Sequence, residues 1–372
     1  MIDSVHEIII TGYGSGGEGV GRLDDGKVVF VRGACMGDVL KVKINKDLPR
    51  SAWGEIVSVI KASEYRIKPE CPHYPQCGGC DFRHMTYEHE LDVKLQRVND
   101  ALKRIGGLSV GADEILSTGK TGGYRNKAVF HSDGKAWGFY ASGSHEVVPI
   151  KRCDLLKGDI NYALSGLNTD GTAGEITIRS GRNGISPPLE EELDGLIFRI
   201  SGFFQVNTEA ALMLFQKARE YAAMSKDETL VDLYCGVGSL AIFVGRDAGR
   251  VLGVELNQAS IKAARENAQR NGFTHIDFIS ADVSKWEAGD IQPDCIIVDP
   301  PRNGLSKGTI KKIAELAPKR IVYVSCDPAT LARDIKALEG YSLTKACAID
   351  MFPRTANVEC CALLQRNATS TA

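Results

Sequence analysis

Apolar runs and amphipathic stretches alternate along the second half of the chain. The runs that predict buried strands are 229–234, 250–256, 276–280, 295–299 and 320–325. Amphipathic segments with helical spacing lie between them, such as 258–270 and 307–317, and this alternation is typical of a parallel sheet covered by helices on both faces. Two further strand patterns, 343–351 and 358–365, predict a hairpin at the sheet edge. We therefore predict a doubly wound α/β domain over residues 206–372.

The first 61 residues have a different pattern, with short β-branched runs after a glycine-rich start. The runs are 28–32, 39–44 and 54–60. Several short strands in so short a segment predict a compact barrel of the oligonucleotide-binding kind over residues 1–61, although any other small β-barrel stays open. Residues 62–205 combine a Cys/Pro/His-rich insert, an amphipathic helix at 91–105 and short β patterns. This segment predicts a central, mainly β region.

Charge and composition narrow the function classes only slightly. The 372 residues carry 45 Lys and Arg against 47 Asp and Glu, a formal net charge of −2, so a polyanion binder would have to concentrate its cations locally. The stretch 117–152 is rich in Lys and Arg and could bind RNA, but its charge alone favours a solvated face. No apolar run is long enough to span a bilayer, and the first ten residues lack a signal-peptide layout. The eleven cysteines are an odd number, and no export signal is visible. We therefore expect a cytoplasmic protein without disulfides.

A glycine turn follows the first strand of the α/β pattern. Gly236 and Gly238 let the backbone approach a ligand at the strand's carboxyl end, and Glu255 closes the next strand, where an acid can bind ribose hydroxyls. Ala241 stands where a dinucleotide-binding turn has its third glycine. That departure favours S-adenosylmethionine, which has a ribose but no pyrophosphate. A purely structural turn in another α/β enzyme is the alternative reading.

Two further motifs lie at later strand ends. Asp299 begins Asp-Pro-Pro-Arg, and Cys326 lies between a strand and a helix start, where the helix dipole can stabilise a thiolate. Uracil C5 becomes nucleophilic only after a thiolate adds to C6, and a base must later remove the C5 proton. Cys326, Glu359, Asp299 and Gln205 are available for these tasks. Alternatively, Cys326 is a buried structural cysteine and Glu359 is a solvent-exposed residue without a catalytic role.

Three cysteines lie close together in the Cys/Pro/His-rich insert. Cys71, Cys77 and Cys80 have the spacing C-x5-C-x2-C, with turn-forming Pro and Gly between them, and such a segment can wrap a metal centre. Cys153 is the best candidate for a fourth ligand, ahead of Cys35 and His73. Thiolates suit zinc or an iron–sulfur cluster, and the spacing alone does not choose between them.

These residues together resemble the RNA uridine-C5 methyltransferase family, in its iron–sulfur branch that acts on 23S ribosomal RNA. The resemblance covers nearly the whole chain. Its motifs are Phe-Gln-Val-Asn at 204–207, Asp-Leu-Tyr-Cys-Gly-Val-Gly at 232–238, Asp-Pro-Pro-Arg at 299–302 and Ser-Cys-Asp-Pro-Ala-Thr-Leu at 325–331. It implies a Rossmann-like class I methyltransferase domain and an N-terminal TRAM barrel.

The resemblance also implies a role for each matching residue. Cys326 would be the nucleophile and Glu359 the base. S-adenosylmethionine would contact Gln205, Tyr234, Ser239, Glu255, Asp282 and Asp299. A [4Fe-4S] cluster would bind Cys71, Cys77, Cys80 and Cys153. The product would be 5-methyluridine in RNA, and the protein is expected to be a monomer.

Two positions depart from the family pattern. Many relatives have Asn where Ser239 stands, and many have His at the position of Asn357, so the local support of these sites differs. The tRNA T-loop is an alternative substrate. A catalytically idle RNA-binding iron–sulfur protein and an amino-group methyltransferase are alternatives from other classes, but neither has a use for Cys326 with Glu359.

Overall fold

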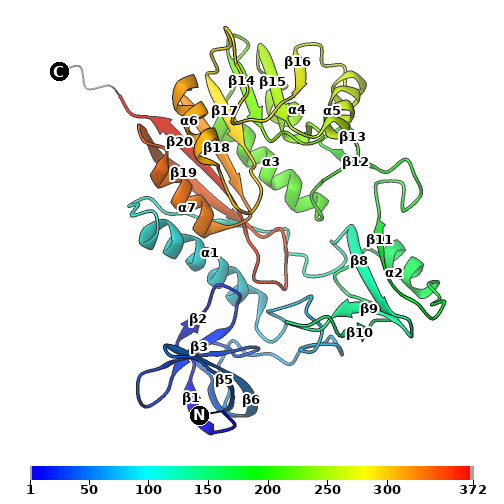
Figure 1. Cartoon of the computed structure of the whole chain (residues 1–372), viewed down its shortest axis with the longest axis vertical. Coiled ribbons are helices and arrows are strands. Elements are labelled where there is room, and N and C mark those ends of the chain that lie inside the picture. Colours follow the sequence, from blue (N-terminus) through cyan, green and yellow to red (C-terminus); the bar gives the residue numbers. More distant parts are fainter. Residues whose placement is uncertain (1, 369–372) are drawn as a thin grey trace.

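The computed structural model describes residues 2–368 and arranges three parts along one long axis (Figure 1). The N-terminal barrel lies at one end, the α/β sheet lies at the other, and the central β region lies beside the barrel. Among the described residues, no helix is both long and apolar enough to cross a membrane.

The barrel is one six-stranded sheet in the order β1-β5-β6-β4-β3-β2. Its strands are β1 (Val5–Ile9), β2 (Gly12–Tyr13), β3 (Gly19–Arg22), β4 (Val28–Val31), β5 (Val39–Asp47) and β6 (Ser51–Lys61). Strict alternation builds its core: Leu40, Val42 and Ile44 are buried, while Lys41 and Lys43 between them are exposed. The three predicted strand runs are confirmed.

The central region contains a four-stranded sheet in the order β10-β9-β8-β11 and a separate hairpin. The elements are α1 (Tyr87–Arg104), β7 (Ile115–Leu116), β8 (Lys127–Asp133), β9 (Trp137–Tyr140), β10 (Val147–Pro149), α2 (Gly158–Ser165), β11 (Ala173–Arg179), β12 (Glu190–Leu193) and β13 (Leu196–Arg199). Helix α1 begins four residues before the predicted start, because the Thr86 hydroxyl caps it by accepting from the His89 N–H. Helix α2 was not predicted.

The C-terminal part is an eight-stranded sheet in the order β16-β15-β14-β17-β18-β20-β19-β7. Its remaining elements are α3 (Thr208–Ala222), β14 (Thr229–Leu233), α4 (Ser239–Gly245), β15 (Arg250–Glu255), α5 (Gln258–Arg270), β16 (Ile276–Ser280), β17 (Cys295–Val298), α6 (Lys307–Leu316), β18 (Arg320–Ser325), α7 (Pro328–Ala337), β19 (Tyr341–Ile349) and β20 (Glu359–Arg366). Strands β14 to β18 pair in parallel, and β20 pairs antiparallel to β18 and β19. The predicted α/β alternation and final hairpin are confirmed.

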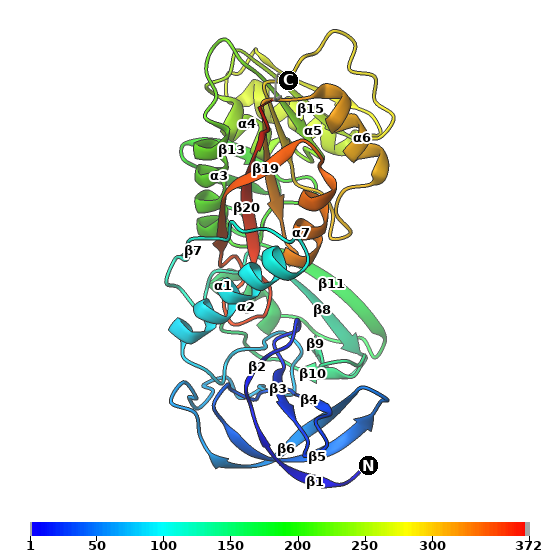
Figure 2. The same cartoon turned by 90° about the vertical axis from the view of Figure 1, so that its left-hand side faces the viewer.

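Helices cover both faces of this sheet (Figure 2). Helices α3, α4 and α5 pack in one hydrophobic core, while α1, α6 and α7 pack in the other. Because both faces are covered, every residue of β17 is buried. One result was not foreseen: α1 and β7 precede the central sheet in the sequence, yet they pack on the C-terminal one, where β7 pairs in parallel with β19.

Candidate active site

The glycine turn lies where the strand order reverses, at the carboxyl end of β14 between β15 and β17. Open α/β sheets bind ligands at such a switch point. Gly238 has φ +79°, and a Cβ there would lie 2.7 Å from Phe278 and 2.9 Å from the Ala264 side chain. Only glycine therefore fits. Glu255 accepts from the backbone N–H groups of Gly236 (3.3 Å) and Asn257 (2.8 Å), which holds the acid beside the turn.

Two other predicted cofactor residues, Tyr234 and Ser239, adjoin this turn. Tyr234 directly follows β14, with its hydroxyl 2.7 Å from Thr309 Oγ1, and Asp282 and Glu255 both raise the pKa of Tyr234, after burial. Ser239 begins α4. Gln205 is buried, and its backbone carbonyl accepts from Asn126 and Arg179 of the central region.

Sheet register brings together the two residues predicted for catalysis. In the antiparallel pair of β18 and β20, Ser325 faces Cys360. Cys326 follows Ser325, and Glu359 precedes Cys360, so the same register continued by one residue sets Cys326 opposite Glu359. Asp299 ends the neighbouring strand β17. Cys326 is half-buried, and Glu359 is 4% exposed.

The surroundings of Cys326 oppose the thiolate stabilisation that its place before a helix suggests. Burial raises the pKa of the Cys326 thiol to about 11, and Glu359 raises it further, while Arg302 lowers it. Burial also raises the pKa of Asp299 to about 7. The pKa of Glu359 lies well above its usual range, because of burial first and Asp299 second. The site therefore holds a thiol and two carboxyls that keep protons easily.

Asp232 and Arg302 complete this polar group. Asp232 is fully buried on β14, neither carboxylate oxygen has a hydrogen-bond partner among the described residues, and burial raises its pKa well above the ordinary value. Arg302 lowers the pKa of both Cys326 and Glu359. Both residues belong to motifs visible in the sequence, but neither was assigned a role there, because only folding shows that they face the same site.

All four cysteines predicted as metal ligands line one cavity of about 280 Å³ in the central region. They are Cys71, Cys77, Cys80 and Cys153. Arg83 Nε donates to Cys80 Sγ at 3.3 Å, and the Gly79 N–H donates to Cys77 Sγ at 3.4 Å. Within residues 2–368, no three His, Cys, Asp or Glu side chains stand close enough to hold a single metal ion. Of the two weaker candidates, His73 lines the same cavity, whereas Cys35 is buried elsewhere, beside Tyr13 of the barrel.

Family models match three segments of the chain. Residues 284–367 match the tRNA (Uracil-5-)-methyltransferase family, and residues 1–57 match the TRAM domain. Residues 230–319 match a methyltransferase domain family. The first match includes Asp299, Cys326 and Glu359, and the third includes the glycine turn.

Relatives extend over nearly the whole chain. An uncharacterized RNA methyltransferase of Clostridium tetani is 32% identical over 96% of this chain and 95% of its own. Another from Caldanaerobacter subterraneus is 32% identical over 98% and 99%. A crystal structure of Pyrococcus abyssi tRNA (uracil-54, C5)-methyltransferase in complex with S-adenosyl-L-homocysteine superposes with a TM-score of 0.77, at 24% identity, over 96% of this chain and 100% of that one. At that identity the superposition shows the shared fold.

Proposed function

This chain belongs to the RNA uracil-5 methyltransferase family and is a SAM-dependent RNA methyltransferase, and from that premise we propose that it methylates C5 of a uridine through a covalent adduct on Cys326. One observation carries the proposal: the register of β18 and β20 sets a half-buried cysteine opposite a buried glutamate at the edge of the cofactor crevice. The chemistry of uracil C5 requires both a nucleophile and a base.

In the proposed sequence Cys326 acts first and Glu359 last. Cys326 Sγ adds as a thiolate to C6 of the uracil ring, which forms a carbon–sulfur bond and makes C5 nucleophilic. C5 then takes the methyl group that S-adenosylmethionine supplies, and S-adenosylhomocysteine leaves. Glu359 removes the proton from C5, and the C6–sulfur bond breaks to release 5-methyluridine and the thiolate. The raised pKa of Glu359 makes it a stronger base than an exposed carboxylate.

The glycine turn and its neighbours fit S-adenosylmethionine. At Gly238 the backbone passes so close to Phe278 that no side chain fits, and Glu255 stands at the end of the adjacent strand to accept ribose hydroxyls. We propose that the cofactor binds here. Its proposed contacts are Gln205, Tyr234, Ser239, Glu255, Asp282 and Asp299.

We also propose that the cysteine cavity holds a [4Fe-4S] cluster. A single zinc ion needs its thiolates about 2.3 Å from one centre, whereas a cluster binds each thiolate to a different iron atom and so tolerates wider spacing. The four thiols that line one cavity support this proposal. Methyl transfer from a sulfonium needs no electron, so the proposed role is structural: the cluster joins Cys153 to the irregular segment at 71–80.

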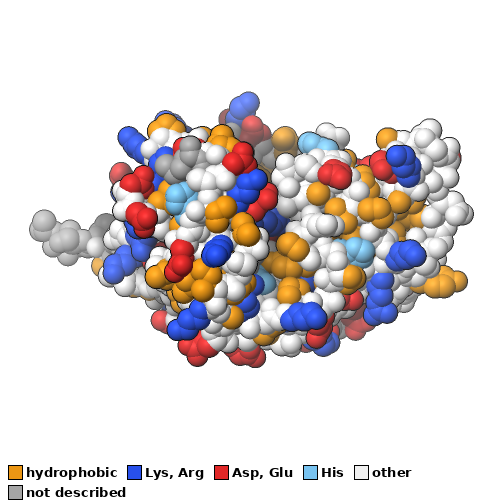
Figure 3. Space-filling model, turned by 90° about the horizontal axis from the view of Figure 1, so that it is seen from below, with side chains coloured by type: hydrophobic (Ala, Val, Ile, Leu, Met, Phe, Trp, Pro, Cys, Tyr) orange, Lys and Arg blue, Asp and Glu red, His pale blue; other side chains and the backbone are white. Residues whose placement is uncertain are grey.

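The proposed RNA surface is a cavity of about 660 Å³ between the barrel, α1 and the start of α7. Arg22, Arg97 and Arg104 line it, and so does Asp327, which follows the nucleophile. Elsewhere at this end of the molecule, Lys and Arg side chains are scattered among acidic and apolar ones (Figure 3). Within the basic stretch 117–152, Lys120 is paired with Glu209. We propose the cavity rather than that stretch because Asp327, beside the proposed nucleophile, lines it.

The proposed substrate is 23S ribosomal RNA, with the tRNA T-loop as the second candidate. The P. abyssi protein of the same fold is named for uracil-54 of tRNA. We therefore retain tRNA as the second candidate substrate. Mapping 5-methyluridine in both RNAs from a strain that lacks the gene decides between them. Complementation with wild type must restore the missing nucleotide, and complementation with Cys326→Ala must not.

A covalent trap separates the proposed chemistry from an amino-group methyltransferase. RNA with 5-fluorouridine at the target should form a denaturation-resistant adduct with the wild type, because fluorine cannot leave C5 as a proton does. Formation of methylated RNA without any adduct, or full turnover by Cys326→Ala, contradicts the covalent mechanism. The domain limits at 61 and 205, the monomeric state and the cytoplasmic location stay predictions.

A further inference from the structure

The loop before Glu359 leads directly into the proposed base. Residues 350–358 connect β19 to β20, and Ile349 pairs with Glu359 across the hairpin. Asp350 therefore begins the loop directly after Ile349, the cross-strand partner of Glu359, and Glu359 directly follows the loop. Asp350 is 0% exposed. Asp350 is thus joined to Glu359 through one pair of strand residues, Ile349 and Glu359.

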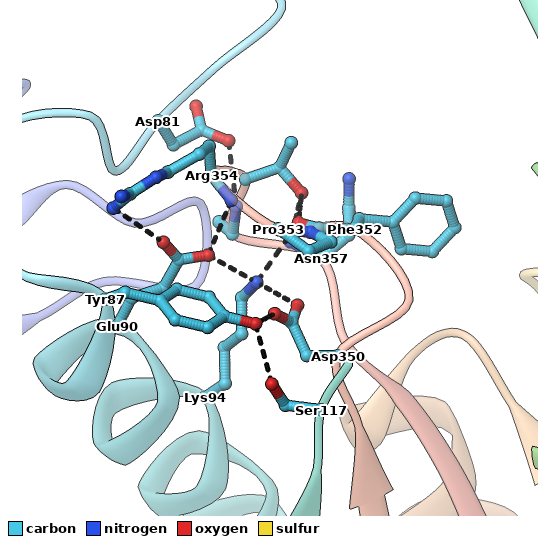
Figure 4. Close-up of polar contacts among 12 residues, drawn as sticks. Asp81, Tyr87, Glu90, Lys94, Ser117, Asp350, Phe352, Pro353, Arg354 and Asn357 are labelled. Carbon is cyan, nitrogen blue, oxygen red and sulfur yellow. Dashed lines mark hydrogen bonds and ion pairs between the residues drawn. The ribbon is translucent and has the colours of Figure 1, made fainter. Parts of the chain in front are cut away.

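Lys94 of α1 holds this loop at two points (Figure 4). Its ammonium is buried, and it donates to Asp350 Oδ1 at 2.6 Å, to the Phe352 carbonyl at 3.1 Å and to Glu90 Oε1 at 2.8 Å. These three bonds use all three donors of the ammonium. Lys94 thus joins the helix to the loop, and a neutral side chain cannot replace it.

Glu90 forms a second connection between α1 and the 350–358 loop. The Arg354 backbone N–H donates to Glu90 Oε1 at 2.7 Å, and the Arg354 guanidinium lies 3.5 Å from Glu90 Oε2. Arg354 has φ +69°, a conformation that costs about 1 kcal/mol or more for a residue with a side chain. Two cations and two carboxylates therefore share one buried site, and removal of Lys94 leaves an unbalanced negative charge there.

Two tyrosines and the cysteine segment close the network. Tyr87 donates to Asp350 Oδ2 at 2.5 Å, and Tyr124 donates to the Pro353 carbonyl at 2.9 Å. The backbone N–H of Asp81, the residue after Cys80, donates to the Arg354 carbonyl at 2.9 Å. The loop is therefore held from α1 and from the cysteine segment together, while none of these contacts touches Cys326.

We infer that Lys94 is a positioning residue for Glu359: by fixing the 350–358 loop from α1, it sets the base for removal of the C5 proton. The inference rests on the proposed function. It assigns Lys94 to the last step, in which Glu359 takes the C5 proton and the C6–sulfur bond breaks. Addition of Cys326 and transfer of the methyl group depend on β18 and the glycine turn, which the network does not hold.

The test compares two steps of one turnover in Lys94→Met. The substrate RNA carries tritium at C5 of its uridines, and the cofactor carries a carbon-14 methyl group, so tritium release reports proton removal and RNA-bound carbon-14 reports transfer. Because a misplacement of about 1 Å can cost about a hundredfold, tritium release should slow at least about tenfold more than transfer, and a denaturation-resistant adduct should accumulate. Lys103→Met, which removes an exposed lysine from the same helix, should change both rates less than about twofold.

A second variant covers the case in which Lys94→Met does not fold. Tyr87→Phe removes one hydrogen bond to Asp350 without changing charge, and it should slow tritium release in the same selective way by about threefold, while Tyr162→Phe on the surface should not. Fractions of active enzyme come from S-adenosylmethionine binding. Equal losses in both steps, or no loss, in a variant that binds the cofactor normally overturn the inference. If wild type releases no C5 tritium, or Cys326→Ala turns over, the proposed function itself fails and the inference falls with it.

Discussion

Asp299 should make the protein less stable at neutral pH than its own asparagine variant. Burial raises the pKa of this carboxyl from 3.8 to about 7. Between these two values the folded state binds more protons than the unfolded state, so the free energy of unfolding falls as the pH rises. Asp299→Asn removes this ionisation, and the variant should gain stability relative to wild type as the pH rises from 4 to 7.

The size of the gain follows from the pKa difference. A difference of about three in pKa, at about 1.36 kcal/mol for each unit, corresponds to about 4 kcal/mol. Asp299 keeps some contact with solvent, which screens the charge and reduces the expected gain to about 2–4 kcal/mol at pH 8. Well below pH 3.8 the carboxyl is protonated in both states, so the difference contributed by ionisation vanishes.

The assay is urea unfolding of both proteins at pH 4, 5.5, 7 and 8 without ligands, followed by fluorescence and by circular dichroism. Asp290→Asn serves as the control, because Asp290 is exposed. The variant-minus-wild-type difference should grow with pH for Asp299 and stay flat for Asp290. A difference at Asp299 that is the same at pH 5.5 and pH 8 would refute the reasoning. Weaker S-adenosylmethionine binding should accompany the stabilisation, because the charge sits in the proposed cofactor site.

Three other outcomes follow from the same site and its surroundings. The value of kcat/KM should rise about tenfold per pH unit between pH 7 and 9, because a thiol with a pKa of about 11 gains thiolate throughout that range; a plateau below pH 8 contradicts this for Cys326. Gly238→Ala should unfold about 2 kcal/mol more easily and bind S-adenosylmethionine poorly, whereas Gly272→Ala, also at positive φ but with open space around it, should cost about 1 kcal/mol. Cys77→Ser should lose iron and RNA affinity with unchanged cofactor affinity; retention of full iron content by that variant would remove Cys77 from the proposed ligand set.

The α/β sheet could be predicted from the sequence because its signals are local. Strands β14, β15, β17 and β18 are mostly buried on both faces, so each appears as a nearly continuous apolar run. The edge strand β16 alternates between buried and exposed residues instead. The hairpin of β19 and β20 could be predicted for the same reason. Helix α2 could not, since its eight residues lack a side-chain cap and carry little periodicity.

The electrostatics of the site could not be predicted, because they depend on contacts distant in the sequence. Cys326 precedes a helix, which suggests a stabilised thiolate, but burial beside Glu359 outweighs the helix and raises its pKa. The Lys94 network was invisible for a similar reason: Lys94 and Asp350 are 256 residues apart, and a lysine on an amphipathic helix normally lies on the solvated face.

Helix α1 lies outside the predicted α/β domain in the sequence, but it packs against elements of the proposed active site. Val98 and Leu102 of α1 pack in the same core as Leu331 of α7, and α7 begins two residues after Cys326. Lys94 lies one turn before Val98 in the same helix, and it holds the 350–358 loop, which precedes Glu359. One helix from the first third of the chain thus supports the elements that present both proposed catalytic residues. The cysteine segment holds the same loop through Asp81, so we expect loss of the proposed cluster to disturb the proposed base as well.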